Sequence, residues 1–468
     1  MKAAHVISLI AVLVGATAFS AMRPVAQWDV VPYQRLKEPF KAGVVAFYDK
    51  PFHVEFTVNG RKAAKVDKPT LNDRTKVVEH WFTIDPASFD PSKLKESKLV
   101  VGAKAVAEDG TKYALPDLLL YWDKNDTLGS KKEIWVDLVD GIDYNEGTKE
   151  LPVKTMKQAV KRAGDGGTVY LSKPGVYPVE RIGGGNGRKF WTTIMPAPGL
   201  SRKDVRIKGA RTGCDKLKFK DVNIFCDVEG GQGYALAGVD ASSSCWLEDC
   251  IVRNKGGRSV ARTFVFGNKL VGYVTGGATT EMANGPCCKL VRNHTIKSIS
   301  ADAFTAEDCL AINCKVIDVE SSGVVDEPAF HRSQGLGGAW VHDVILANIT
   351  ATACGCNGFI GLKLRDSVFS NITLETTGPE RRFVSRYAWE MENVWFDRVK
   401  VTGQEWVWFK AENHNGDFTP TDVRVTNCSF ELPKPEDERR ALHANGWNTR
   451  KFYTIYTFYT AKKITTNS

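Results

Sequence analysis

The 468-residue sequence predicts an all-β protein in which a long solenoid of short parallel strands follows a smaller unit of antiparallel strands. Three observations lead to this prediction. A short apolar pattern centred on Asn or Asp recurs after residue 217, and shorter alternating segments with tight-turn pairs precede it. The composition, with 41 Gly and 6 Met, is more typical of a turn-rich β protein than of a helical one.

The first 21 residues have the pattern of a secretory signal peptide. Lys2 supplies a positive start, an apolar run covers Val6–Val14, and Ala16 and Ala18 are spaced as at a cleavage site. The apolar run is too short to span a bilayer. We therefore expect a secreted or periplasmic protein without stable membrane insertion.

The chain carries a modest excess of positive charge. The formal net charge is +9 at pH 7, and the pI is near 8.9. Lys and Arg are scattered, without a basic run or a recognisable nucleic-acid module, so no nucleic-acid partner is expected. An anionic polysaccharide is the partner that this charge favours, and the sequence does not determine the oligomeric state.

Residues 22–130 are predicted to form a small immunoglobulin-like β-sandwich. Apolar residues alternate in His53–Val58, and the Asn59-Gly60 pair that follows is typical of a hairpin turn. Leu99–Val106 is a further strand, with Asp109-Gly110 as its turn. Short strands between such turns favour two packed sheets. We interpret this unit as a spacer or docking module, with carbohydrate binding as the alternative.

A polar linker near residues 123–132 leads into a segment that is predicted to close one end of the solenoid. The segment consists of a strand, a Gly/Asp-rich loop, a short helix and a second strand. Leu151, Met156 and Val160 lie near helical spacing, and Gly164 is a helix stop signal. A closing helix is required because an open end would expose apolar side chains and strand edges.

The repeat itself consists of alternating apolar positions around one polar residue. This polar position falls at Asp221, Asp249, Asn293, Asn313, Asn348, Asn371, Asn393 and Asn427. Residues two before, one after and three after it are apolar, with His294 the one markedly polar member. The interval of 44 residues between Asp249 and Asn293 predicts an additional coil near Leu270–Val274. Repetition of period-two strands at this spacing predicts a β-solenoid.

The repeat resembles the asparagine ladder of the pectate-lyase-like superfamily, whose members are right-handed parallel β-helices. Asn suits a corner because it tolerates left-handed backbone, and stacked Asn side chains can hydrogen-bond between coils about 4.8 Å apart. The resemblance covers residues 134–432 and implies a single-stranded β-helix over residues 131–435. Residues 436–468 form a tail that the pattern does not explain. The superfamily includes lyases, hydrolases and adhesins, so the resemblance is specific for fold alone.

The ladder changes the interpretation of two other patterns. Four ladder residues begin N-x-[ST] sequons, and we expect their side chains to be buried rather than glycosylated: Asn293, Asn348, Asn371 and Asn427. The chain has an odd number of cysteines, 11, without zinc-binding spacing. Three of them occupy inward positions and are predicted to be packed, unpaired thiols: Cys250, Cys314 and Cys428.

The same resemblance implies a ligand groove on the strand face opposite the ladder, lined by long loops. The long insertion between Asn313 and Asn348 is the predicted centre of the site. The candidate catalytic residues are His331, Arg332, Asp302, Asp326 and Glu327. The candidate substrate-binding residues are Gln334, Asn357, Lys363, Arg382, Trp406, Trp408 and Lys410. Aromatic rings stack on sugars, and cations bind carboxylates or sulfates.

These residue types favour an exported enzyme that cleaves an anionic polysaccharide, either a polysaccharide lyase or a glycoside hydrolase. A lyase needs a base and a cation that neutralises a uronate, whereas a hydrolase needs two carboxylates. The alternative is a non-catalytic glycan-binding or cell-surface structural protein. No cofactor or metal is expected, and calcium bound by Asp302, Asp326 and Glu327 is a weaker alternative.

Overall fold

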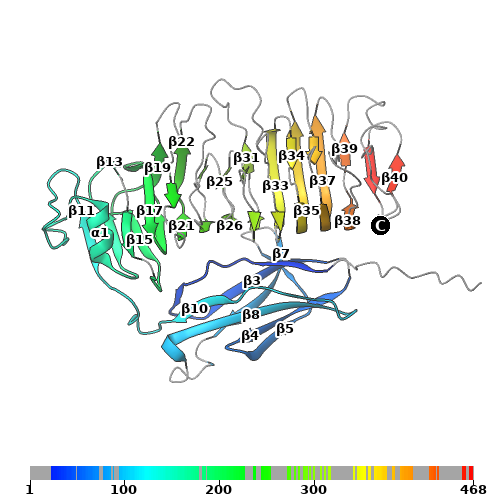
Figure 1. Ribbon diagram of the computed structural model, residues 1–468, viewed down its shortest axis with the longest axis horizontal. Coiled ribbons are helices and arrows are strands. Elements are labelled where there is room, and N and C mark those ends of the chain that lie inside the picture. The colour runs from blue at the N-terminus through cyan, green and yellow to red at the C-terminus, as the bar shows by residue number, and fades with distance from the viewer. Residues whose placement is uncertain are drawn as a thin grey trace, which may run out of the picture.

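The computed structural model describes residues 23–226, apart from 49, 73–76, 86–87, 89–93, 179–181 and 186. Beyond them it describes residues 236–238 and 244–254, the strands given below, and Asn427. Within these residues the protein is almost entirely β. Antiparallel strands come first, and a long parallel stack follows (Figure 1).

Two sheets form the N-terminal part of the chain, here called the two-sheet unit. The first sheet has the order β1 (Val25–Trp28), β3 (Phe40–Phe47), β7 (Val77–Ile84) and β6 (Thr70–Asn72). The second has the order β2 (Arg35–Leu36), β10 (Leu118–Trp122), β8 (Lys98–Ala107), β4 (Phe52–Val58) and β5 (Arg61–Val66), and β9 (Lys112–Ala114) pairs with β8. A short 3-10 helix, Lys95–Ser97, precedes β8.

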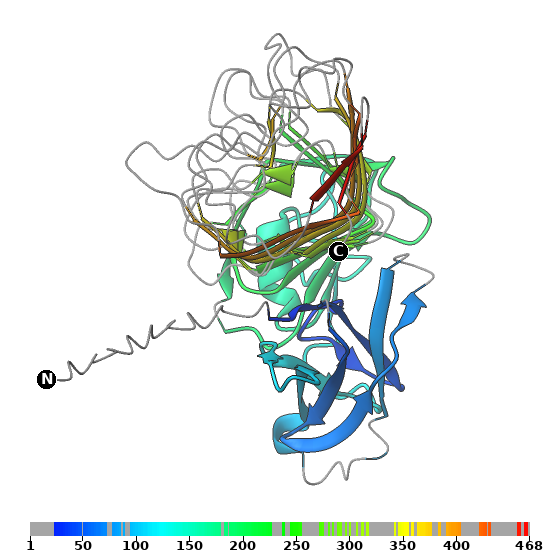
Figure 2. The ribbon, with the colours of Figure 1, turned by 90° about the vertical axis from the view of Figure 1, so that its right-hand side faces the viewer.

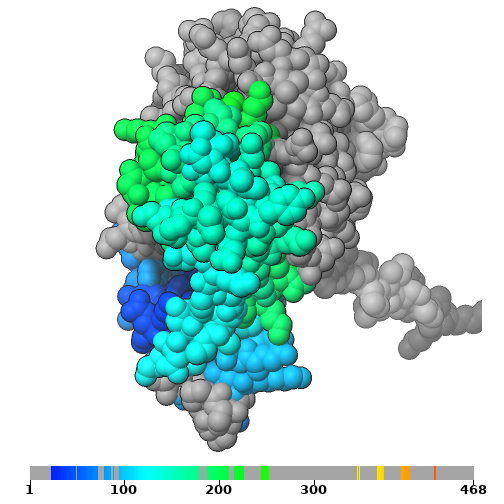
Figure 3. All heavy atoms as spheres, turned by 90° about the vertical axis from the view of Figure 1, so that its left-hand side faces the viewer, coloured from blue at the N-terminus to red at the C-terminus, as the bar shows by residue number. Residues whose placement is uncertain are grey.

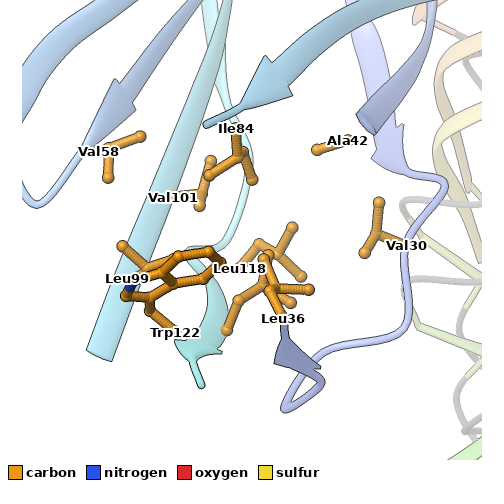
Figure 4. Packing of buried hydrophobic residues seen from close by; sticks show 10 residues of the cluster. Val30, Leu36, Ala42, Val58, Ile84, Leu99, Val101, Leu118 and Trp122 are labelled. Atoms are coloured by element: carbon orange, nitrogen blue, oxygen red, sulfur yellow. The ribbon is translucent and has the colours of Figure 1, made fainter. Parts of the chain in front are cut away.

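The apolar alternation predicted for residues 53–58 places Val54, Phe56 and Val58 in the interior between these sheets. Ala26 and Val44 of the first sheet pack in one cluster with Val54 and Phe56 of the second. A second cluster holds Val30, Leu36, Ala42, Val58, Ile84, Leu99, Val101, Leu118, Leu120 and Trp122 (Figure 4). The Asn59-Gly60 turn is confirmed, because both residues have positive φ, 49° and 76°, as a two-residue hairpin of this kind requires.

The predicted helix is α1 (Met156–Ala163), which contacts β11 (Glu133–Val136) and β12 (Thr168–Leu171) at the first end of the stack (Figure 1). In the space-filling view from this end, the turquoise part of the chain covers the middle of the face (Figure 3). Thr155 caps its N-terminus by accepting a hydrogen bond from the Gln158 amide at 3.2 Å, a signal that the sequence analysis did not use. Gly164, at φ 71°, ends the helix as predicted. Leu151 does not belong to the apolar face, because it precedes the helix and is 50% exposed.

The parallel stack contains two long rows of strands and shorter pairs beside them. The first row is β11 (Glu133–Val136), β12 (Thr168–Leu171), β15 (Thr192–Pro196), β18 (Leu217–Lys220), β21 (Ser244–Glu248), β23 (Val271–Thr275), β26 (Cys288–Arg292), β30 (Leu310–Ile312), β33 (Ile345–Cys354), β35 (Lys363–Thr376), β37 (Glu390–Gly403) and β38 (Thr421–Thr426). The second row is β13 (Gly175–Pro178), β16 (Val205–Lys208), β19 (Asn223–Cys226), β22 (Ile251–Asn254), β24 (Thr279–Thr280), β27 (Thr295–Ile296), β31 (Lys315–Ile317), the later parts of β33, β35 and β37, and β39 (Ser429–Glu431).

Shorter parallel groups complete the coils. A third row consists of β14 (Ile182–Gly185), β17 (Ala210–Cys214) and β20 (Leu236–Gly238), then β25 (Ala283–Asn284) with β28 (Ile299–Ser300), and β34 (Asn357–Phe359) with β36 (Arg382–Val384). The strand β29 (Ala306–Glu307) pairs with β32 (Val341–His342), and β32 pairs with the start of β35. In the tail, β40 (Tyr456–Tyr459) and β41 (Lys463–Thr466) form an antiparallel pair.

The strand register confirms that the apolar residues two positions before the ladder residues lie side by side in successive coils through most of the stack. Phe219 pairs with Leu247, Leu247 pairs with Val274, and Val274 pairs with Val291. The additional coil predicted between Asp249 and Asn293 is therefore β23. Phe219 and Leu247 are fully buried, which explains why this column must be apolar.

The predicted ladder is confirmed at four of its eight positions and wrong at Asn393, and Asn293 and Asn313 lie outside the described residues. Left-handed backbone occurs at Asp221, Asp249, Asn371 and Asn427, with φ between 50° and 55°. The neighbour of Asn371 in the next coil is Arg398, also left-handed at φ 50°, because Ser370 pairs with Asp397 and Ile372 with Val399.

Asn393 instead lies opposite Asp366, at an earlier corner of the coil. Both residues have positive φ, 52° and 47°, and the Asn393 amide donates to the Asp366 carboxylate at 2.7 Å. Each earlier corner precedes the ladder corner by five residues, as 366 precedes 371 and 393 precedes 398. A pattern centred on Asn cannot separate the two corners, because both need a residue that accepts left-handed backbone.

The expected burial of the sequon side chains is also wrong for two residues. Asn371 and Asn427 are exposed, whereas Asn393 at the earlier corner is 2% exposed. Exposure does not remove the contact between coils, because the Asn427 amide donates to the Asp397 carboxylate at 3.2 Å. Asn293 and the side chain of Asn348 lie outside the described residues.

The two-sheet unit packs along the outer side of the first row of the stack (Figures 1 and 2). Val25, Val31 and Val45 belong to this unit. One buried cluster unites them with Trp191, Trp246, Tyr273, Ile345, Ala347 and Val368 of the stack, and Tyr33, Phe47 and Trp395 pack against it. The contact therefore runs from an early coil at Trp191 to a late one at Trp395.

Candidate functional site

The predicted catalytic residues lie outside the described residues. These are His331, Arg332, Asp302, Asp326 and Glu327, and with them the substrate-binding candidates Gln334, Trp406, Trp408 and Lys410. Their roles stay predictions. The described strands on either side of the long insertion are β31 and β32, so the insertion connects a second-row strand to the strand that leads into the next coil.

Two of the predicted substrate-binding residues are brought together by the strand register. Asn357 begins β34 and Arg382 begins β36, and the two residues are direct partners in parallel pairing. Parallel neighbours in a sheet lie about 4.8 Å apart. Their distances from the ladder differ, nine residues from 348 to 357 and eleven from 371 to 382, because the intervening turns differ in length. Lys363 lies apart from this pair, at the start of β35, where its partner is Glu390.

The outer side of the first row is closed to a polymer by the two-sheet unit. Trp191 anchors this contact. Its ring lies edge-on to Trp246 and Tyr273, each at 5.8 Å between centroids, and its Nε1 donates to the Pro32 carbonyl at 2.7 Å. Because these rings are buried against the two-sheet unit, they cannot stack on a sugar. A ligand groove must therefore use another side of the stack.

The charged groups at this contact are paired in ways that stabilise structure. The Lys218 ammonium lies 2.9 Å from the Glu248 carboxylate and 3.6 Å from the centre of the Trp246 ring. Burial lowers the pKa of Lys218, although Glu248 opposes the shift. Burial alone would raise the pKa of Glu248, but Lys218 and Lys220 outweigh it and the pKa is lowered. A carboxylate held ionised between two lysines is a poor general acid.

A second polar group, missed by the sequence analysis, surrounds Asp397 at the late coils. Asp397 is 3% exposed. One carboxylate oxygen accepts from Ser370 at 3.2 Å and lies 2.9 Å from the Arg398 guanidinium. The other accepts from Thr426 at 2.9 Å and from Asn427 at 3.2 Å. Because donors from the preceding coil, the following coil and Arg398 fill its acceptor positions, this carboxylate holds the corners of three coils together.

The cysteine prediction is confirmed where the structure tests it. Cys250 is buried and unpaired. Burial raises the pKa of the Cys250 thiol to about 12, so the thiolate is not populated at neutral pH. Cys314 and Cys428 lie outside the described residues.

Neither a metal centre nor a membrane span is found in the part of the chain that the structure describes. No group of three or more His, Cys, Asp or Glu side chains there is placed to hold a metal ion. No helix there is both long and apolar enough to cross a membrane. The carboxylates considered for calcium lie outside that part of the chain.

No protein-family model and no curated protein matches the chain. Among solved structures, a pectin methylesterase from Aspergillus niger is similar at 13% identity, over 59% of this chain and 88% of the other, with a TM-score of 0.27. A pectate lyase from Pectobacterium carotovorum is similar at 10% identity, over 92% and 97%, with a TM-score of 0.15. A pectate lyase from Erwinia chrysanthemi, solved with tetragalacturonic acid, is similar at 11% identity, over 88% and 90%, with a TM-score of 0.16. Likeness at this level assigns neither an activity nor a substrate to the chain.

Proposed function

We propose that the protein is an exported right-handed parallel β-helix, residues 131–435, carrying an immunoglobulin-like sandwich, residues 22–130, and that it binds and cleaves an anionic polysaccharide. The observation that carries the proposal is the pairing of Asn357 with Arg382 in the third row. An amide and a guanidinium on neighbouring coils are suited to hydroxyl and carboxylate groups of a sugar chain.

The closed outer side of the first row supports the same placement. The two-sheet unit occupies that side through the cluster around Trp191, so a polymer would have to use another side of the stack, and the third row is one of those sides. The long insertion with His331 and Arg332 follows the second-row strand β31 in the chain, as β34 and β36 follow the second-row parts of β33 and β35. A rigid row of strands flanked by long loops is a common arrangement for binding and catalysis.

Two chemistries are compatible with the candidate residues. In elimination, His331 removes the C5 proton next to the uronate carboxylate, which Arg332 or Arg382 neutralises. The C4–O glycosidic bond then breaks, a C4–C5 double bond forms, and the leaving oxygen takes up a proton from solvent. In hydrolysis, Asp302 acts with Asp326 or Glu327 as an acid and a base or nucleophile. Side chains on the same stripe lie about 5 Å apart in neighbouring coils and about 10 Å apart two coils away, spacings that cover both hydrolytic geometries.

The test is to incubate the mature protein with a panel of uronic and sulfated polysaccharides. New reducing ends report either cleavage, and unsaturated products report elimination alone. His331→Ala and Arg332→Ala should each lower turnover about a hundredfold or more while the melting temperature stays nearly unchanged. Arg61→Ala, at an exposed position of β5, is the matched control for loss of one positive charge.

The outcomes separate the proposal from its alternative. Binding without any new ends would favour a non-catalytic glycan-binding or cell-surface protein. Full turnover in both variants would remove the insertion from the catalytic site, and Trp406, Trp408 and Lys410 would be examined next. A wild-type protein that neither binds nor cleaves any polymer of the panel would refute the proposal.

A further inference from the structure

Arg23, which precedes the first strand of the two-sheet unit, binds two corner residues of the stack. Its guanidinium donates from Nε to one oxygen of Asp366 at 2.6 Å and from Nη2 to the other. Its backbone N–H donates to the side-chain oxygen of Asn393 at 3.2 Å, across 370 residues of chain. The Asn393 amide donates to Asp366 at 2.7 Å, so the three residues form one hydrogen-bonded set, here called the corner group.

Asp366 and Asn393 are the start and the end of a single coil. Both have positive φ, and their flanking residues are direct partners in β35 and β37, so the chain returns beside its own starting point. Between the two corners it passes through the first and second rows in β35 and through the third row in β36. Arg382, the partner of Asn357 in the proposed site, therefore belongs to the coil whose two ends meet in the corner group.

The charge balance of the corner group depends on Arg23. The side chain of Asp366 is 11% exposed, so most of its carboxylate is withdrawn from water. The Asn393 amide donates a hydrogen bond but carries no charge, whereas the bidentate guanidinium supplies the opposite charge in the geometry that a carboxylate prefers. Removal of one partner of such a pair leaves an uncompensated charge, and this costs more than the net contribution of the intact pair.

The two-sheet unit holds Arg23 at this corner. Val25 begins β1 and is buried in the cluster that the two-sheet unit shares with the stack. Val25 pairs with Phe47 of β3, whose ring lies edge-on to Trp395 at 6.4 Å between centroids. Trp395 follows Asn393 by two residues, so the two-sheet unit contacts the end of this coil at two points. Because β1 is fixed by these contacts, little additional entropy is lost when Arg23 binds the corner.

We infer that Arg23 is a positioning residue for the proposed polysaccharide site, because it joins the two ends of coil 366–393 and so fixes the register in which Arg382 lies beside Asn357. The inference rests on the proposed function, since it concerns the same site. Arg23 acts through Asp366 and the neighbouring corner and does not touch the polymer. The two-sheet unit thereby contributes to ligand binding from the side of the stack that it covers.

Amide hydrogen exchange of the full-length mature protein, measured by mass spectrometry, tests the joining of the coil. Arg23→Ala should raise exchange rates in peptides from residues 366–393 about three- to tenfold, while peptides around Trp191 keep the wild-type rates. Arg23→Lys keeps the charge but loses the planar fork, so it should restore part of the protection. Arg23→Ala with Asp366→Asn should also restore part, because no uncompensated charge remains. Unchanged exchange in Arg23→Ala would overturn the inference, whatever the protein binds.

Calorimetry with four-residue oligosaccharides, prepared from the uronic polymers of the panel, tests the role in binding. Well below the melting temperature, Arg23→Ala should weaken binding about three- to tenfold, and Arg23→Lys should weaken it less. Trp191→Ala is the control for lost stability, because it disrupts the contact between the two-sheet unit and the stack at an early coil. Arg61→Ala is the control for lost charge at an exposed position. Both controls should bind like the wild type.

The outcomes separate the inference from the proposed function. Equal losses of affinity in Arg23→Ala and Trp191→Ala would show a general effect of stability and overturn the inference, while the proposed function stands. Wild-type affinity in Arg23→Ala would overturn it in the same way. If the wild-type protein binds none of the oligosaccharides or polymers, the inference and the proposed function fail together.

Discussion

Trp191 provides the sharpest test of how the two parts of the molecule are joined. The side chain is 6% exposed and lies within 6.5 Å of three aromatic rings, those of Tyr33, Trp246 and Tyr273. Trp191→Ala removes these contacts and leaves a cavity between the two-sheet unit and the stack. It also removes the donor to the Pro32 carbonyl.

The expected loss follows from these contacts. Truncation of a well-packed aromatic residue to alanine costs about 3–5 kcal/mol, and a buried carbonyl without its donor costs about 1 kcal/mol or more. Partial closure of the cavity reduces the total, so we expect the free energy of unfolding to fall by about 4 kcal/mol. Urea denaturation followed by circular dichroism and by tryptophan fluorescence measures this change.

Trp135→Ala is the matched control. Trp135 also lies on the outer side of the first row, 4.9 Å from the Tyr170 ring, but it is partly exposed and does not belong to the cluster shared with the two-sheet unit. Its loss should cost about 1–2 kcal/mol. If Trp191→Ala were no more destabilising than Trp135→Ala, the contact between the two-sheet unit and the first row would contribute little to stability, which would refute this prediction.

Three further predictions follow from other buried groups. Burial, with a smaller effect of His53, lowers the pKa of His80 from 6.5 to about 4. As the pH falls, the unfolded chain therefore binds a proton at His80 before the folded protein does. The free energy of unfolding should fall by roughly 3 kcal/mol between pH 6.5 and pH 4. His80→Gln should flatten that part of a plot of stability against pH, and an unchanged slope would exclude His80 as its source. Asn393→Ala should lower the free energy of unfolding by about 1–3 kcal/mol, because Asp366 loses a donor. Asn371→Ala, at an exposed corner, should lower it by less. The reverse order of stabilities in thermal melts would contradict the register. Cys250 should react with a thiol reagent only after unfolding, and labelling of the native protein, followed by peptide mapping, would show that its burial is wrong.

The sequence proposes a region for the candidate site, and the structure adds one contact within it, the pairing of Asn357 with Arg382. Counting from the ladder places Asn357 after the second-row part of its coil, where β34 lies. It does not give its partner, because the connection before Arg382 is three residues longer than the connection before Asn357, and a register shift near Thr352 changes the count from the ladder by one residue in the other direction. Each coil of a solenoid tolerates such insertions, so offsets from a fixed corner accumulate errors that only pairing between coils resolves.

By itself, the sequence determined those features that depend on local chemistry. Alternation made Phe56 and Phe219 interior residues, Asn59-Gly60 required a hairpin turn, and Gly164 ended the helix. Each follows from the conformations and burial preferences of a few adjacent residues. The same reasoning predicted the additional coil at β23, since two turns of chain must fit into 44 residues.

Only the tertiary structure decided which corner each polar residue occupies and which outer surfaces are covered. Arg398 takes the ladder corner and Asn393 the earlier one because stacking against the neighbouring coils selects the register, and either residue can adopt the backbone that a corner needs. The outward rings of Trp246 and Tyr273 become interior when the two-sheet unit packs against them. Their burial depends on a contact between segments far apart in the chain, and no pattern within a single strand encodes it.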